Sequence, residues 1–123
     1  MDTIEVFAKA QLNYALEQSW SLKSSSKWSA ENPSKGQCGV TTLVVNDILG
    51  GEIRKTLLSE GWHFYNMIHN IRFDFTKYQF NECISYEDMP SNRQEAFMDT
   101  NYNQYNYLKN SVLKELSKWN RDS

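Results

Sequence analysis

The stretch WHFYNMIHNIRFDFT, residues 62–76, constrains the fold more than any other part of the chain. Two runs rich in aromatic and β-branched residues, 62–68 and 71–76, are separated by His69-Asn70. Strand-type runs joined by two turn-forming residues are typical of a β-hairpin. Residues 52–58, which end shortly before Gly61, read as a preceding strand. We therefore expect a small antiparallel sheet.

The length of the hairpin loop decides which side chains share a face. With an even loop about His69-Asn70, Ile68 faces Ile71 and Tyr65 faces Asp74. Side chains alternate along a strand, so His63 lies on the Tyr65 face as the diagonal neighbour of Asp74. Such a pair fixes the tautomer of a catalytic base. An odd loop would separate the two, and a strand histidine beside a surface aspartate is the ordinary alternative.

Residues 38–49, CGVTTLVVNDIL, carry two conflicting signals. The β-branched run VTTLVV favours a strand. The three- and four-residue spacing of its apolar side chains, with Gly50-Gly51 as a stop, favours a helix. The pattern alone leaves this open. We favour a helix that begins at Cys38, on the strength of the resemblance described below.

Both ends of the chain have helical periodicity. Residues 2–18 predict an amphipathic helix capped by Asp2 or Thr3. Residues 91–119 predict one long helix, with Ser91 and Gln94 as a capping box. We expect these two helices to cover the sheet face that the central helix leaves open. The chain, 1–123, is then a single α+β domain, in which the central helix packs on a small antiparallel sheet between flanking helices.

Two connections complete this organisation. Residues 19–36 form a Ser-rich loop that we expect Trp20 and Trp28 to anchor inward. Residues 77–90 read as irregular. Together with Trp62 and Gln79, the two loop tryptophans are candidates to line a substrate groove.

Cys38 is the candidate nucleophile. A reactive cysteine must be a thiolate, and a helix N-terminus or a neighbouring imidazolium lowers its pKa. The Cys38 backbone N–H and a side-chain amide, from Gln37 or Asn32, are candidates to stabilise an oxyanion. Sequence does not choose between these two amides. A buried, inert cysteine is the plain alternative, and Cys83 is interpreted in that way.

The order of these residues resembles a known arrangement. A Cys at a helix start followed by His and Asp on successive antiparallel strands resembles the core of papain-like peptidases and transglutaminases. The segments HFYN and DFT match the strands of the transglutaminase-type version. Together with GQCGVTTLVVNDILGGEI and KYQF, they resemble the YunG-like family of small bacterial proteins over residues 20–116. The resemblance implies a papain/transglutaminase-like fold and a triad of Cys38, His63 and Asp74.

We expect a thiol enzyme that acts on an amide or related acyl bond. Resolution by water would make it a peptidase, amidase or deamidase, and resolution by an amine a transglutaminase-like transferase. The alternative is a non-catalytic binding or inhibitory protein that keeps the fold and uses aromatic anchors. We favour a protein or peptide substrate over a small molecule.

Composition excludes several other classes. Lys and Arg number 13 against 15 Asp and Glu, a formal charge of −2, which argues against nucleic acid as a partner. No segment predicts a secretory signal or a membrane span. With two cysteines and no export signal, we expect free thiols in the cytoplasm. Metal-ligand spacings are absent from the sequence, so we expect no metal and no other cofactor.

Overall fold

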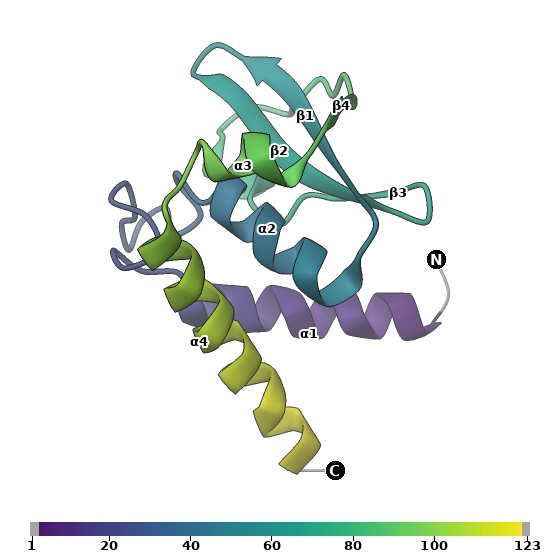
Figure 1. Cartoon of the computed structure of the whole chain (residues 1–123), viewed down its shortest axis with the longest axis vertical. Coiled ribbons are helices and arrows are strands. Elements are labelled where there is room, and N and C mark those ends of the chain that lie inside the picture. The colour runs from purple at the N-terminus through teal and green to yellow at the C-terminus, as the bar shows by residue number, and fades with distance from the viewer. Residues whose placement is uncertain (1–2, 122–123) are drawn as a thin grey trace.

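The computed structural model describes residues 3–121, which form helices and one sheet around a shared hydrophobic core. Figure 1 shows the sheet on one side of the molecule, with α1, α2 and α4 on the other. The helices are α1 (Thr3–Ser19), α2 (Cys38–Leu49), α3 (Arg93–Phe97) and α4 (Tyr102–Arg121). The strands are β1 (Glu52–Leu58), β2 (Gly61–Ile68), β3 (Ile71–Phe73) and β4 (Met89–Ser91), with a 3-10 turn, η1 (Lys77–Gln79). Asp2, one expected cap of α1, lies outside the described residues.

The hairpin register that was expected is confirmed. The four-stranded sheet has the order β3-β2-β1-β4, and each neighbouring pair is antiparallel. Ile68 pairs with Ile71 across a two-residue turn. His69 and Asn70 make this turn with φ of 51° and 64°, the left-handed geometry that suits the twist of a tight hairpin. The even loop therefore places His63 on the same face as Asp74, the first residue after β3.

The last strand of the hairpin is shorter than expected, because β3 ends at Phe73 and not at residue 76. The carboxylate of Asp74 accepts hydrogen bonds from the backbone and the hydroxyl of Thr76, at 3.3 and 3.4 Å. Local bonds of this kind compete with a strand ladder and turn the chain.

Residues 38–49 are helical, as favoured. Every residue from Cys38 to Val45 is buried, because α2 packs on the sheet through its contacts with β2. Asn66 Nδ2 donates to the carbonyl of Thr42 at 3.1 Å and fixes this packing. Tertiary burial therefore overrides the strand propensity of VTTLVV.

The expectation that α1 and α4 cover the opposite sheet face is wrong. These two helices pack against each other, and α4 also contacts α2 (Figure 1). The chain after β3 covers the far face instead. Phe80 packs edge-on against His63, with ring centroids 5.1 Å apart, and Tyr86 against Tyr65, at 5.0 Å. An irregular segment thus shields the histidine from solvent.

The C-terminal region is two helices and not the expected single one. Residues 98–101 separate α3 from α4. Asn92, one residue after the expected Ser91, caps α3 by accepting from Glu95 N–H at 2.9 Å. Asn101 accepts from Gln104 N–H at 2.9 Å at the start of α4. Side chains that satisfy free backbone groups favour helix ends, so this polar cluster restarts the helix. The short strand β4 was also missed.

Candidate active site

His63 and Asp74 form a buried pair on the sheet face covered by residues 77–88. His63 Nε2 lies 2.7 Å from Asp74 Oδ2, and their side chains are 1% and 3% exposed. His63 Nδ1 is also buried, and it makes no hydrogen bond to any residue that the structure describes. The aspartate therefore leaves one ring nitrogen available for chemistry.

Asp74 is held by more than the histidine. Tyr86 donates its hydroxyl to Asp74 Oδ2 at 2.7 Å, and Thr76 binds Oδ1. Burial, and then the bond to the Asp74 carboxylate, raises the pKa of Tyr86. Tyr86 therefore stays a neutral donor, and with Thr76 it fixes the carboxylate that orients His63.

Cys38 is the first residue of α2 and is buried. Its sulfur lies 3.4 Å from Asp99 Oδ2, and the same oxygen accepts from the Gly39 backbone N–H at 3.1 Å. The backbone N–H of Phe64 lies close enough to the sulfur to favour the ionised form of the thiol. Phe64 follows His63 directly in β2, so the thiol lies beside the strand that carries the histidine. The structure joins Cys38 to Asp99 and His63 to Asp74, without a hydrogen bond between the two pairs.

The expected thiolate at Cys38 is not the state that this environment favours. Burial, and next the charge of Asp99, raises the pKa of the Cys38 thiol far above its ordinary value. The bond from Phe64 N–H acts in the opposite direction and is the smaller effect. The helix N-terminus and the His63 imidazole were expected to lower the pKa of the Cys38 thiol, but desolvation of the thiolate has the larger, opposite effect. The resting thiol is therefore neutral.

Asp99 is a site residue that the sequence reasoning missed. Partial burial raises its pKa, while its bonds to Cys38 and Gly39 and the charges of Lys27 and His63 act against this rise. One signal was present in the sequence. Asp99, Thr100 and Asn101 follow one another among the seven residues between Phe97 and Tyr105. Three consecutive residues that favour helix ends indicate a break.

Glycine at position 39 makes the Asp99 contact possible. An added Cβ would lie 2.6 Å from Asp99 Oδ2 and 2.8 Å from the backbone oxygen of Ala96. Gly36 has a similar role on the other side, with φ of +74° and the turn of Ser25 and Lys27 against it. Close approach of two backbone segments therefore encloses Cys38.

The two oxyanion candidates differ in the structure. Asn32 donates its amide to the carbonyl of Gln79 at 3.0 Å, so this group is already engaged. Gln37 is fully buried beside Cys38, and neither its amide nitrogen nor its amide oxygen has a partner among the described residues. A buried polar group without a partner calls for a functional or structural reason. Gln37 is the candidate that keeps a free amide.

The four residues expected to line a substrate groove have different environments in the structure. Trp20 is a core residue whose Nε1 donates to Thr41 Oγ1 at 2.9 Å, so it lines no groove. Trp28 packs against the core with Nε1 buried and unpartnered in the described chain. Trp62 is 39% exposed and lies under the Lys55 ammonium. Gln79 Oε1 accepts from Gly36 N–H at 3.2 Å and ties η1 to the loop before Cys38.

A hollow of about 550 Å³ lies against the Asp74 side of the site. Asp74 and Tyr86 line it, together with the cationic side chains of Lys9, Arg72 and Lys77. Arg72 is paired with Asp88, whereas the two lysines make no ion pair within the described part of the chain. The hollow thus brings positive charge next to the carboxylate that orients His63.

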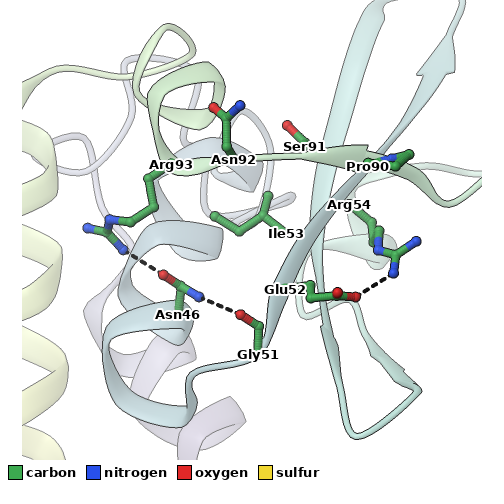
Figure 2. A pocket seen from close by; sticks show the side chains of 9 residues that line it. All are labelled: Asn46, Gly51, Glu52, Ile53, Arg54, Pro90, Ser91, Asn92 and Arg93. Carbon is green, nitrogen blue, oxygen red and sulfur yellow. Dashed lines mark hydrogen bonds and ion pairs between the residues drawn. The ribbon is translucent and has the colours of Figure 1, made fainter.

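A second hollow, of about 360 Å³, lies at the other end of α2. Figure 2 shows Asn46 and Arg93 on one side of it and Glu52 and Arg54 on the other. Asn46 is eight residues beyond Cys38, about 12 Å along the helix axis. Arg93 is bound to Asn46 and Asp47, and Arg54 to Glu52, so the charges here stabilise the fold.

Two kinds of feature are absent from the described residues. No group of three or more His, Cys, Asp or Glu side chains is placed to hold a metal ion there. Among the helices that the structure describes, none has the length and apolar character needed to cross a bilayer. Cys38 and Cys83 are both free thiols; Cys38 is buried, whereas Cys83 is exposed, so the expectation of a packed thiol at position 83 is wrong.

Comparison with known proteins identifies relatives of the chain. A family model described as YunG protein matches residues 8–117. An uncharacterised protein, YunG, of Bacillus subtilis (strain 168) is 51% identical over 106 residues, which cover 86% of this chain and 92% of the relative. No solved structure matches.

Proposed function

The chain belongs to the YunG family, and we propose that it is a thiol enzyme that acts on an amide or related acyl bond. One observation carries this proposal: His63 is buried, bound to Asp74 through Nε2, and has Nδ1 without a partner in the described structure. Phe64, the next residue of the same strand, lies beside the Cys38 thiol, where its backbone N–H favours the ionised form. The proposed nucleophile, its proposed base and the residue that would orient the base are therefore near one another, which supports this proposal.

The proposed chemistry divides the work among these side chains. Nδ1 of His63 takes the proton of the Cys38 thiol, and the sulfur attacks the carbonyl carbon of the substrate. The protonated histidine then gives this proton to the leaving amine, which leaves an acyl group on the sulfur. Water resolves the acyl-enzyme in a peptidase, amidase or deamidase, and a second amine does so in a transferase. Asp74 stabilises the imidazolium that forms between these steps.

The oxyanion has two proposed donors. The first is the set of backbone N–H groups at the start of α2, which form the positive end of the helix dipole. The Gln37 amide lies next to them and is buried without a partner among the described residues. We interpret the whole arrangement as a papain/transglutaminase-like core, because it combines a helix-terminal Cys with His and Asp from one hairpin.

The proposed substrate is a peptide or protein in a reducing cytoplasm. The hollow beside Asp74 is large enough to hold several side chains, and its cations suit an acidic segment. Two free cysteines are consistent with a reducing compartment.

Covalent trapping of Cys38 tests the proposal. In a Cys83→Ser background, a peptide amide analogue that carries an electrophilic carbon should label Cys38 alone, as read by mass spectrometry. His63→Ala should slow this labelling by about 100-fold, the usual contribution of a positioned base. His69→Ala is the matched control, because His69 is the only other histidine and lies in the exposed hairpin turn. Equal labelling rates in the parent and His63→Ala proteins would refute the proposed role of His63.

A second candidate, a non-catalytic binding protein, is favoured by one observation. Burial and the Asp99 carboxylate keep the Cys38 thiol neutral, which is unusual for a working nucleophile. Under this alternative the pair of His63 and Asp74 only stabilises the sheet. Labelling of Cys38 that is slow and independent of His63 would favour this second candidate.

A further inference from the structure

The Asp99 carboxylate occupies the position at Cys38 that a substrate needs. Its Oδ2 lies 3.4 Å from the sulfur and 3.1 Å from the Gly39 nitrogen. An acyl oxygen must lie within reach of the nucleophile and of a main-chain donor at the same time. Asp99 therefore places an oxygen of its own where the oxygen of an acyl substrate would lie.

We propose that Asp99 is a self-inhibitory carboxylate, which closes the Cys38 site until it swings outward to Lys27. The inference rests on the proposed function for its biological meaning, since it describes how that same thiol is regulated. The contact itself is a property of the fold. It can therefore be tested by thiol reactivity alone.

The surroundings of Asp99 give it a second position. Lys27 is exposed, its charge acts on the Asp99 carboxylate, and it makes no ion pair elsewhere in the described chain. The turn that carries Asp99 is at the surface, where Met98 is 84% exposed. Rotation of the Asp99 side chain would therefore take the carboxylate away from the thiol, in the direction favoured by the charge of Lys27.

The absence of a side chain at Gly39 supports a close contact at this place. A Cβ there would be 2.7 Å from Asp99 Cβ as well as 2.6 Å from Oδ2. The α3–α4 turn thus approaches α2 so tightly that only glycine fits between them. The competing explanation is that Asp99 only caps α2, because Gln37, the residue at the N-cap position, makes no side-chain hydrogen bond to the start of the helix.

The experiment measures alkylation of Cys38 by iodoacetamide near neutral pH, in the full chain with Cys83→Ser. Asp99→Asn keeps an oxygen that can accept from Gly39 N–H but removes the charge. We expect it to speed alkylation by about tenfold or more, the effect of losing one hydrogen bond to a charged group. Lys27→Ala should slow alkylation by about twofold to threefold, because the outward position loses its cation.

Thr100→Ala is the matched control, because it alters the same turn without touching Cys38. A helix cap predicts that Asp99→Asn and Thr100→Ala accelerate alkylation only in proportion to the stability they remove, which thermal unfolding measures. That result would overturn the proposal, as would an Asp99→Asn protein that reacts no faster than its parent. Should Asp99→Asn fail to fold, Lys27→Ala on the exposed loop decides, since an unchanged or faster rate contradicts the proposal.

The two hypotheses fail separately. Faster alkylation in Asp99→Asn, with no effect of His63→Ala, would support the inhibitory carboxylate and reject the catalytic base. A strong effect of His63→Ala, with none of Asp99→Asn, would support the base and reject the inhibitory carboxylate.

Discussion

At the scale of single residues, the ionisation of Cys38 couples the site to the stability of the fold. Burial, and then the Asp99 charge, raises the pKa of the folded thiol. An unfolded chain ionises the same thiol near pH 8.5. Above that pH the unfolded state binds fewer protons than the folded state, so the free energy of unfolding must fall as pH rises. The stabilising contribution is fully present below the unfolded pKa.

Urea unfolding across this range measures the effect. In a Cys83→Ser background, between about pH 8.5 and pH 9.5, we expect a loss of about 1 kcal/mol, because the slope for one proton approaches its limit of about 1.4 kcal/mol per pH unit only above the unfolded pKa. Cys38→Ala should remove this slope, whatever it costs in packing. An identical pH dependence in both proteins would show that the Cys38 thiol is not protected in the fold.

Tyr86 contributes a hydrogen bond to the carboxylate that orients His63. Tyr86→Phe keeps the ring contact with Tyr65 and removes only the hydroxyl bonded to Asp74. We expect a loss of about 1.5–3 kcal/mol in the free energy of unfolding, as for a bond to a charged group, measured by chemical denaturation. Tyr78→Phe is the control, because Tyr78 is 78% exposed and should change stability by less than about 0.5 kcal/mol. Equal effects of the two variants would contradict the prediction.

At the scale of elements, Gly39 allows the start of α2 to pack closely against the α3–α4 turn. Gly39→Ala would place Cβ 2.8 Å from the backbone oxygen of Ala96, which cannot rotate away. We expect the free energy of unfolding to fall by about 1–3 kcal/mol through overpacking, although alanine favours helices.

A double variant separates the contacts of this added Cβ. Gly39→Ala with Asp99→Ala removes the clash with the Asp99 carboxylate and leaves the clashes with the Cβ of residue 99 and with the backbone oxygen of Ala96. The double variant should therefore remain less stable than Asp99→Ala alone, as judged by thermal unfolding. If Gly39→Ala were neutral or stabilising, the close approach of the two segments would be wrong.

The hairpin was predicted well from the sequence, because the residues that determine it lie next to one another in the chain. Two turn-forming residues, His69 and Asn70, set the hairpin register and hence the face of His63. The sequence of α2 was ambiguous, because strand propensity and helical spacing disagreed. Packing on β2 decides the matter, and a single sequence does not contain that contact.

The errors have a common physical origin. Asp74, Asn92 and Asn101 each bond to nearby backbone groups, which shortens β3 and divides the last helix. These bonds join residues that are close in sequence. They compete with the regular hydrogen bonds of the strand and the helix, whose strength depends on tertiary packing. Asp99 was missed at the site for the same reason, because the break in the helix is what brings its carboxylate to Cys38.

At the scale of the whole molecule, α4 holds the helical layer together. It contacts both α1 and α2, and Ser111 Oγ donates to Ser19 Oγ at 2.9 Å. Leu108 of α4 is fully buried in the core cluster, while Leu113 on the same helix is 44% exposed. The two leucines therefore offer a matched test of whether α4 belongs to the cooperative core.

Leu108→Ala should lower the free energy of unfolding by about 2–5 kcal/mol, because it removes buried methyl groups and leaves a cavity. Leu113→Ala should cost less than about 0.5–1 kcal/mol, since its side chain already meets solvent. Trp20 is buried in the same core, so the tryptophan fluorescence to which it contributes should report the same transition as far-UV circular dichroism. Two separate transitions, or similar costs for the two leucines, would mean that α4 folds apart from the layer carrying Cys38. Coincident transitions would instead make the Asp99 turn, which joins α3 to α4, part of one cooperative unit with the thiol that it contacts.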